Sequence, residues 1–565
     1  MDYKPLPIGT DDFRKLVTSG YYYVDKTIFV KELLDKKVEV NLFTRPRRFG
    51  KTLNLSMLRY FFEDTGDAQI NAQNRKLFDG MEIMQEGERY TDEMTSYPVI
   101  QLSLKSAKQP TWELAYASLK EIIQNEFKRH MDIINGFVIE ADRSRFLRLA
   151  GCAGSDADYV TALAFLSNCL ESYYKKSVIL LIDEYDVPLE NAYFQGFYTQ
   201  MVDFIRSLFE SALKTNPSLN FAVITGCLRI TKESIFTGLN NLEIISVLTK
   251  DYSQYFGFTP QDVEELLEYY QLSEKEDCIR QWYDGYLFGD TEIYNPWSII
   301  NYVKTLLADK EEPPRPYWSN TSSNNIIRSL IERSDLSVKA EIEDLIEGKS
   351  IEKPVHEDIT YEDIYQSMDN LWNFLFFTGY LKKSGQRVID HQIYIKLSIP
   401  NVEIRQIYKT KVMGWFQDKI EQKDMSGLYR SMLEGNAEEF QKSLTGILQD
   451  TISFYDNAEA FYHGFMLGIL GKLKTYIVKS NREGGDGRFD ILLRSLDISR
   501  PIIIMELKAA KKYKMLANEA DDALAQIQKM GYDREFAEEG YEKSIRYGIA
   551  FYKKNCMIKK MEIEL

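Results

Sequence analysis

The sequence predicts a multidomain α/β protein with a parallel sheet at its N-terminal side and a smaller α/β domain at its C-terminal end. Two observations lead to this prediction. Short apolar segments alternate with helical patterns over the first 250 residues, which is typical of a parallel sheet covered by helices on both faces. Strand-like segments that carry acidic residues return near the end of the chain. At 565 residues and roughly one domain per 150 residues, the chain is expected to form three or four units.

The N-terminal region, residues 1–250, contains five segments that are rich in β-branched and apolar residues. Such runs, bounded by polar residues and separated by helical patterns, predict buried strands. The segment "VILLI" is apolar at every position, as a central strand buried on both faces requires. The predicted strands cover residues 38–44, 97–104, 177–186, 220–226 and 242–247.

The middle of the chain changes in character after Asp251. Tyrosine-rich helical patterns follow, and the alternation of strands and helices ends. The proline-rich run at 309–325 predicts a surface loop or a junction between subdomains. A helix followed by a strand hairpin, at about 371–405, indicates a helical or winged-helix-like region over 251–400. A helical connector over 401–450 and a last domain over 451–565 complete the predicted organisation.

Composition and charge narrow the classes of function. With 44% hydrophobic and 27% charged residues, the chain is expected to fold throughout. The net charge of −15 argues against a protein that coats nucleic acid generally, although the last domain is close to neutral and the acidity lies before it. Five cysteines without a C-x-x-C pair make a zinc cluster improbable. No apolar run approaches the roughly 18 residues of a membrane span, so a cytoplasmic location without membrane contact is expected.

The stretch "NLFTRPRRFGKTLNLS", residues 41–56, ends like a phosphate-binding loop. Gly50, Lys51 and Thr52 fit G-x-x-x-x-G-K-[ST], while Arg45 stands where the first glycine is expected. A predicted strand precedes the loop and a helical pattern at 51–63 follows, so loop amides and a helix N-terminus can meet a phosphate. This Walker A motif predicts Lys51 at the β- and γ-phosphates of ATP and the Thr52 hydroxyl on Mg²⁺. The preceding Arg47, Arg48 and Phe49 are candidate nucleotide-binding residues.

The strand "VILLIDEYD" predicts the acidic half of the same site. Asp183 follows five apolar residues and is expected to position Mg²⁺, as in a Walker B motif. Glu184 is the candidate base that activates the attacking water.

Arg45 poses a question of loop geometry. The usual glycine permits a tight turn with unusual backbone angles, and Pro46 offers another way to stiffen the start of the loop. Arg45, Arg47 and Arg48 are expected to place three cations beside a polyphosphate. For each arginine, an ion pair with an acidic neighbour or exposure to solvent is the alternative.

These motifs resemble the AAA-ATPase-like family of prokaryotic proteins, which has a P-loop NTPase fold. The likeness rests on "YYYVDKTIFVKELL", "NLFTRPRRFGKTLNLSML", "LLIDEYDVPL" and "ITGCLRITKESIFTGLNNLEIISV" and covers roughly residues 4–300. It implies that arginine at position 45 is normal for the family. It also implies that Thr225 or Arg229 senses the γ-phosphate, although a strand cap and a structural ion pair are alternatives. Asp25 and Lys26 are suggestive without an assigned role.

A second group of acidic residues lies near the end of the chain. Asp490 opens the strand-like "FDILLR", and sixteen residues later "IIIMELK" places Glu506 and Lys508 two residues apart. Residues i and i+2 of a strand share a face, so Glu506 and Lys508 are expected to project together. Two carboxylates and a lysine can bind a divalent cation and orient a water for phosphodiester hydrolysis. An exposed ion pair on a strand is the structural alternative.

This pattern resembles the PD-(D/E)xK nuclease superfamily, which implies a restriction-endonuclease-like fold for about 451–547. The resemblance implies Glu459, Asp490 and Glu506 as metal ligands, Lys508 as a catalytic residue and Gln526 near the site. Phe489 replaces the usual proline. Gln528 and Tyr532 offer a second Q-x-x-x-Y spacing, so the glutamine that faces the site is left open. His463 is interpreted as a packed histidine.

Together these features predict an ATPase that regulates a nuclease dependent on Mg²⁺ or Mn²⁺. DNA is preferred over RNA as substrate, and a second copy of the chain or another protein is an open partner. The alternative is a nucleotide-dependent regulatory or scaffold protein whose degenerate nuclease fold only binds nucleic acid or a protein.

Overall fold

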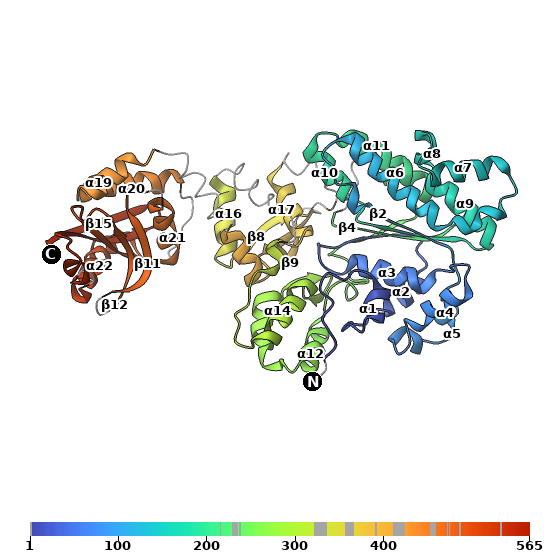
Figure 1. Ribbon diagram of the computed structural model, residues 1–565, viewed down its shortest axis with the longest axis horizontal. Helices are drawn as coiled ribbons and strands as arrows, with labels where there is room; N and C mark the ends of the chain where they lie inside the picture. Colours follow the sequence, from blue (N-terminus) through green and yellow to red (C-terminus); the bar gives the residue numbers. More distant parts are fainter. Residues whose placement is uncertain are drawn as a thin grey trace. The chain divides into compact units, whose positions relative to one another are not determined.

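The structure is a computed structural model that divides into two compact units (Figure 1). The N-terminal unit comprises Met1–Ser322 and Ser350–Arg405, and the C-terminal unit comprises Ser323–Lys349 and Gln406–Leu565. The described residues are 3–214, 216–228, 235–236, 239–320, 336–355, 357, 367–389, 392–410, 424–451, 459–471, 473, 475–484, 487–531 and 534–565.

The core of the N-terminal unit is a five-stranded parallel sheet with the order β2-β3-β4-β1-β5. Every residue of β1 and β3 is buried, as is expected where helices cover both faces of a sheet. All five strands coincide with predicted segments, so the predicted fold class is confirmed. The strands are β1 (Val40–Thr44), β2 (Val99–Ser103), β3 (Val178–Asp183), β4 (Leu219–Gly226) and β5 (Leu242–Ile245).

Helices lie on both sides of this sheet (Figure 1). One layer contains α1 (Phe13–Thr18), α2 (Ile28–Lys36), α3 (Lys51–Phe62), α4 (Ala68–Lys76) and α5 (Glu88–Thr91). The other layer contains α6 (Trp112–Arg129), α7 (Glu140–Ala150), α8 (Asp156–Val160), α9 (Ala162–Tyr174), α10 (Val187–Gln195) and α11 (Tyr198–Leu213). Because the strands are parallel, their carboxyl ends meet at one edge of the sheet, where the loops after β1, β3 and β4 converge.

Strand β2 forms one border of the sheet, and side chains from α6 cover its outer backbone. The Glu126 carboxylate accepts a hydrogen bond from the Gln101 amide at 2.8 Å, and the Arg129 guanidinium donates to the Val99 carbonyl. An edge strand offers amides and carbonyls to other chains. These two side chains therefore occupy positions at which a further strand would bind.

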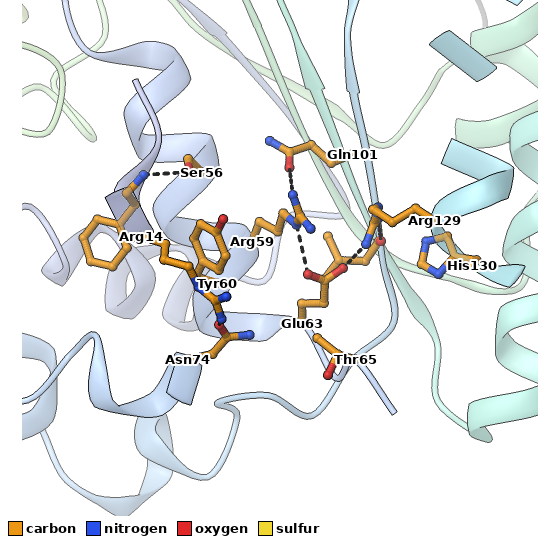
Figure 2. Close-up of polar contacts among 12 residues, drawn as sticks. Arg14, Ser56, Arg59, Tyr60, Glu63, Thr65, Asn74, Gln101, Arg129 and His130 are labelled. Atoms are coloured by element: carbon orange, nitrogen blue, oxygen red, sulfur yellow. Dashed lines mark hydrogen bonds and ion pairs between the residues drawn. The ribbon is translucent and has the colours of Figure 1, made fainter. Parts of the chain in front are cut away.

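The same arginine belongs to an ion-pair network that Figure 2 shows around Glu63. Glu63 follows the end of α3 and contacts Arg59 at 2.9 Å on one side and Arg129 on the other. Burial alone would raise the pKa of Glu126, but Arg129 and then His130 hold it well below its usual range. The network joins the end of the phosphate-loop helix to the border of the sheet.

The middle of the chain adds helices and two small antiparallel sheets to the N-terminal unit. The helices are α12 (Pro260–Tyr269), α13 (Glu276–Tyr283), α14 (Pro296–Ala308) and α17 (Met368–Phe377). After α17, β9 (Lys382–Ile389) and β10 (Gln392–Ser398) form the expected hairpin, and β8 (Ile351–Pro354) pairs with β10.

The tyrosine-rich part of the middle region, which the sequence predicts as helical, also contains a second hairpin. Strands β6 (Tyr286–Phe288) and β7 (Thr291–Ile293) pair antiparallel around Gly289, which has φ 56°. Three residues are too few to produce a recognisable alternation.

The C-terminal unit has a five-stranded mixed sheet with the order β11-β12-β13-β14-β15. Helix α22 connects the parallel pair β13–β14 and covers one face, where its Leu516 and Ala520 pack against Ala550. On the opposite face the Tyr547 ring meets Phe440 of α20, and Phe551 stacks on Tyr462 of α21 at 4.4 Å between centroids.

The strands of this sheet are β11 (Ile477–Gly484), β12 (Gly487–Arg494), β13 (Ile502–Ala509), β14 (Lys543–Tyr552) and β15 (Asn555–Glu564). The helices of the unit are α16 (Leu336–Ile346), α19 (Ser426–Leu433), α20 (Ala437–Thr451), α21 (Glu459–Leu470), α22 (Leu516–Met530) and α23 (Arg534–Glu538). Across the described parts of both units, no helix has the length and apolar content that a membrane crossing needs.

Candidate functional site

The phosphate loop joins β1 to α3 and holds its lysine in a folded-back position. Gly50 has φ 82°, a left-handed conformation that glycine adopts without strain, and α3 begins at Lys51. Lys51 is only 6% exposed, and its ammonium donates to the carbonyls of Arg45 and Pro46 at 2.9 Å each. The lysine therefore already lies along the inner side of the loop, where a phosphate could replace its two backbone acceptors.

Arg45 does not lie beside the phosphate position, so the expectation of three cations at a polyphosphate was wrong for this residue. The side chain is fully buried and donates to the carbonyls of Thr44 and Ile245 at 3.0 and 2.8 Å. Its guanidinium carbon lies 5.4 and 5.1 Å from the ring centroids of Phe256 and Phe288. Burial lowers the pKa of Arg45 to about 9. This residue thus joins the start of the loop to the end of β5.

The other loop arginines and Phe49 contact α10 and the middle region. Arg47 forms an ion pair with Glu190, and the Arg48 guanidinium lies over the Trp297 ring at 4.4 Å. Arg48 has φ 72°, a left-handed backbone conformation within the loop. The buried Phe49 ring packs edge-on to Tyr286 at 5.0 Å.

The acidic end of β3 meets the first residues of α3. Asp183 accepts hydrogen bonds from the Thr52 hydroxyl at 2.7 Å and from the Thr225 hydroxyl at 2.5 Å. Strand β4 lies between β1 and β3, so it brings Thr225 between the loop and the aspartate. A threonine hydroxyl beside a carboxylate is the oxygen donor set that Mg²⁺ prefers, and the chemistry of these two residues fits the predicted metal position.

Glu184 follows Asp183 and has φ 53°, so its side chain points in a different direction from that of a regular strand residue. It lines a cavity next to the phosphate loop. Burial, and then the Asp183 carboxylate, raise the pKa of Glu184, while Lys51 acts in the opposite direction. The next acidic residue, Asp186, accepts the amides of Cys227 and Leu228 at 2.7 and 3.2 Å and so holds the chain after β4. Arg229, the other candidate sensor, lies outside the described residues.

A cavity of about 450 Å³ opens next to the phosphate loop. This volume lies within the range of about 300–1,000 Å³ that is usual for small-molecule sites. Its polar lining includes the loop and Lys105, Lys108 and Glu184. Its apolar lining comes from the N-terminal segment, the residues at and before α12, and α14, and the sequence did not identify these residues: Leu6, Pro7, Tyr22, Val24, Phe258, Leu266, Trp297 and Ile300.

Asp25 and Lys26 position the wall of this cavity. Asp25 accepts the Thr27 amide and hydroxyl at 2.8 and 2.7 Å, at the start of α2. Lys26 lines the cavity and forms an ion pair of 2.5 Å with Asp262 of α12. The ion pair between Lys26 and Asp262 therefore joins the N-terminal segment to α12.

In the C-terminal unit, Asp490 and Glu506 come together on adjacent strands. The β12–β13 register pairs Ile491 with Met505, so the next positions outward are Asp490 and Glu506. Opposite residues of an antiparallel pair share a face, and the Asp490 carboxylate accepts the Leu507 amide at 2.8 Å. Lys508 lies two residues after Glu506 on the same face and is half-buried.

Helix α22 completes this acidic face. The Gln526 side chain donates to the Glu506 carboxylate, and Glu506 is 3% exposed. Close approach of α22 depends on Gly548, since a Cβ there would lie 2.3 Å from the Ala520 carbonyl oxygen. Gln526 therefore faces the site, whereas Gln528 is exposed.

The remaining predicted residues stand as follows. Glu459 is the first residue of α21, but its side chain lies outside the described part of the structure, as does Tyr532. The His463 Nε2 atom is 3.0 Å from the Asp490 carbonyl oxygen and 3.2 Å from the Ser480 hydroxyl, which agrees with a packed histidine. Among the described residues no group of three or more His, Cys, Asp or Glu side chains is arranged to hold a metal. The two carboxylates still supply the oxygen donors that Mg²⁺ and Mn²⁺ prefer.

Comparisons with known proteins agree with this arrangement. Residues 7–236 match the family described as Predicted AAA-ATPase, and residues 457–561 match the PD-(D/E)XK nuclease superfamily. An uncharacterized protein in the vnfD 5′ region of Azotobacter chroococcum mcd 1 is 28% identical over 416 residues, which are 72% of this chain and 69% of that protein. The chain thus has an N-terminal AAA-ATPase-like region and a C-terminal region similar to the PD-(D/E)XK nuclease superfamily.

Proposed function

We propose that the protein binds and hydrolyses ATP and uses the nucleotide to regulate a divalent-metal-dependent nuclease that acts on DNA. The observation that carries the ATPase part is the contact of the Thr52 hydroxyl with Asp183, beside a loop whose lysine is already directed inward. Thr52 and Asp183 would hold Mg²⁺, which supplies neutralisation of charge on the β- and γ-phosphates.

The residues of the chain would contribute as follows. Lys51 exchanges its two backbone carbonyls for phosphate oxygens, and the amides at the start of α3 bind the same phosphates. Glu184 accepts the proton of the attacking water, and a raised pKa brings a carboxylate closer to the operating pH of a general base. Thr225 acts through Asp183, with which it shares a hydrogen bond.

At the second site, Asp490 and Glu506 would hold Mg²⁺ or Mn²⁺, which supplies a more acidic water and stabilises charge at the scissile phosphate. Lys508 orients the attacking water or stabilises the developing negative charge. Gln526 keeps one Glu506 oxygen engaged and so fixes the orientation of the carboxylate.

Regulation is supported by contacts of the phosphate loop with the middle region. Arg48 lies over Trp297 of α14, and the Trp318 indole donates to the Arg47 carbonyl at 3.4 Å. Pro46 packs closely against Gly379, between α17 and β9. A loop that moves when ATP binds would therefore move three segments of the middle region.

The alternative function is a nucleotide-dependent regulator whose nuclease fold only binds nucleic acid or a partner protein. It is favoured by the burial of Glu506, which is 3% exposed and held by Gln526. If Glu506 is to ligate a metal ion that also contacts a substrate, α22 has to move away when the substrate binds.

Calorimetric titration of ATP in the presence of Mg²⁺ tests the first site. The wild type is expected to bind, and Lys51→Ala is expected to lose most of the affinity because its ammonium is the loop's phosphate contact. Lys128→Ala, which changes an exposed lysine of α6 that does not line the cavity, provides the matched control. Equal affinity of a folded Lys51→Ala protein would reject the proposed phosphate site.

Cleavage of a labelled DNA strand with Mg²⁺ or Mn²⁺, with and without ATP, tests the second site and its regulation. The proposal predicts metal-dependent cleavage whose rate changes with ATP in the wild type but not in Lys51→Ala. If no DNA or RNA is cut under any of these conditions, the binding-module alternative is preferred.

A further inference from the structure

Two lysine-rich segments lie next to each other where β13 and β14 end. The strands are parallel, with Ala509 opposite Phe551, and the Ala510 amide donates to the Phe551 carbonyl at 2.8 Å. The chain continues as residues 511–514 after one strand and as the turn at 553–554 after the other. We name this the lysine–tyrosine surface and define it by Lys511, Lys512, Tyr513, Lys514, Lys553 and Lys554.

Most of the positive charge of this surface is not neutralised by carboxylates of the described residues. Within the described ranges, no carboxylate lies within 4.0 Å of the ammonium groups of Lys511, Lys512, Lys514 or Lys554. The carboxylate of Asp521 on the nearby helix α22 contacts Lys559 instead, at 3.5 Å. In a chain with a net charge of −15, this surface is a local concentration of positive charge.

Tyr513 adds an aromatic ring to the charged groups. The residue is 64% exposed, and its ring centroid lies 6.3 Å from that of Tyr552 at an interplanar angle of 71°. The contact with Tyr552 orients the ring while most of it remains open to solvent. Lysines that contact phosphates, combined with an aromatic ring on which a base can stack, are the elements that bind single strands.

We propose that the lysine–tyrosine surface binds single-stranded nucleic acid and leads it to the acidic face of the C-terminal sheet. Lys508, on that face, precedes Lys511 by three residues, so a strand bound to the lysines continues toward Asp490 and Glu506. A single strand exposes its bases for stacking on Tyr513, whereas a duplex does not. The inference rests on the nucleic-acid part of the proposed function and specifies the form of the substrate.

The test measures binding without cleavage, with the full-length protein in EDTA. Fluorescence anisotropy follows a labelled 20-nucleotide DNA strand, an RNA strand of the same sequence and the corresponding DNA duplex. A triple variant with Lys511, Lys512 and Lys514 changed to Gln is expected to bind single strands at least tenfold more weakly. The slope of log affinity against log salt concentration is also expected to be shallower by about 2, because each of the three lost phosphate contacts contributes about 0.7 to the slope.

Tyr513→Ala is expected to bind single strands about five- to a hundredfold more weakly with an unchanged salt dependence, and Tyr513→Trp is expected to bind like the wild type. The matched control changes Lys442, Lys529 and Lys543, which are exposed lysines of the same unit outside the surface, to Gln. Circular dichroism and ATP affinity confirm that each variant is folded.

The proposal is overturned if the control triple variant loses as much affinity as the surface variant, if Tyr513→Ala binds like the wild type, or if the wild type binds no single strand. Tighter binding of the duplex also overturns it. The affinities for the DNA strand and for the RNA strand show which of the two the surface prefers. Failure of the proposed nuclease activity would be a different result. If the wild type binds single strands through this surface but never cleaves them, this inference stands and the catalytic proposal is rejected.

Discussion

The phosphate loop and the acidic face of the C-terminal sheet hold charged groups in different ways. In the loop, the Lys51 ammonium is bound by two carbonyls only five and six residues earlier in the chain. On the acidic face, Asp490, Glu506 and Gln526 come from β12, β13 and α22, and only strand register and helix packing bring them together. The position of Lys51 depends mainly on local backbone, and the acidic face depends mainly on tertiary alignment. Substitutions far from the chemistry should therefore affect the second site more.

At the phosphate loop, the largest effect is expected at Glu184. We expect Glu184→Gln to reduce ATP hydrolysis by about 10²- to 10⁴-fold, because the amide cannot accept the proton of the attacking water. ATP affinity should change little, because Lys51 and the loop amides remain. Phosphate release and calorimetric titration measure the two quantities. Turnover equal to that of the wild type would remove Glu184 from the role of base.

On the acidic face, Asp490→Ala and Lys508→Ala should both abolish metal-dependent cleavage but should differ in metal binding. A carboxylate can ligate Mn²⁺ and an ammonium cannot. Calorimetric titration should therefore show weaker Mn²⁺ binding only for Asp490→Ala, and both variants should bind ATP normally. Cleavage by Lys508→Ala at the wild-type rate would contradict the assigned chemistry even if the fold is correct.

Gly548→Ala tests whether the second site depends on helix packing. The added Cβ would lie 2.3 Å from the Ala520 carbonyl oxygen and 2.5 Å from the Leu524 nitrogen, so α22 must shift and carry Gln526 away from Glu506. We expect the C-terminal unit to lose about 1–3 kcal/mol of stability in thermal unfolding and cleavage to slow, with ATP affinity unchanged.

Gly446→Ala in α20 is the matched control for this substitution, since no atom lies within 4 Å of its added Cβ. Alanine should raise helix propensity at this position by up to about 1 kcal/mol. If Gly548→Ala is as stable and active as Gly446→Ala, close packing of α22 is not what positions Gln526.

The smallest expected effect is a change in how stability varies with pH in the N-terminal unit. Glu403 is fully buried and accepts the Trp318 amide and the Ser298 hydroxyl at 2.8 Å each. Burial raises the pKa of Glu403 to about 7 from 4.5, so the folded state binds more protons than the unfolded state between these values. The stabilising contribution is present below pH 4.5 and is lost as the pH rises through about 7.

Glu403→Gln should therefore flatten the decrease in thermal stability between pH 5 and 8, because the amide resembles the protonated acid. The exposed Glu264→Gln on α12 should leave the profile of the wild type unchanged. A profile of Glu403→Gln that matches the wild type would show that this carboxyl does not titrate in that range.

The sequence by itself determined the parts of the molecule that depend on local pattern. The five parallel strands, the helix after Gly50 and the position of Asp183 at the end of β3 follow from apolar runs, a loop motif and the alternation of elements. A continuous apolar strand predicts burial on both faces wherever it is placed, and a loop before a helix brings its amides to one point. Glu506 and Lys508 share a face for a similar reason, since they lie two residues apart on one strand.

Only the tertiary structure decided which distant groups meet. Arg45 belongs by motif to the phosphate loop, but its side chain is buried beneath it because the ends of β1 and β5 and the ring of Phe288 enclose it. Tyr22 and Trp297 line the same cavity, although no local sequence pattern in either segment predicts the other. Likewise, Gln526 and Gln528 both lie on α22, and the rotation of the helix on Gly548 determines that Gln526 reaches Glu506. Periodicity is a local property of the chain, whereas register, helix rotation and burial are set by packing between segments far apart in sequence.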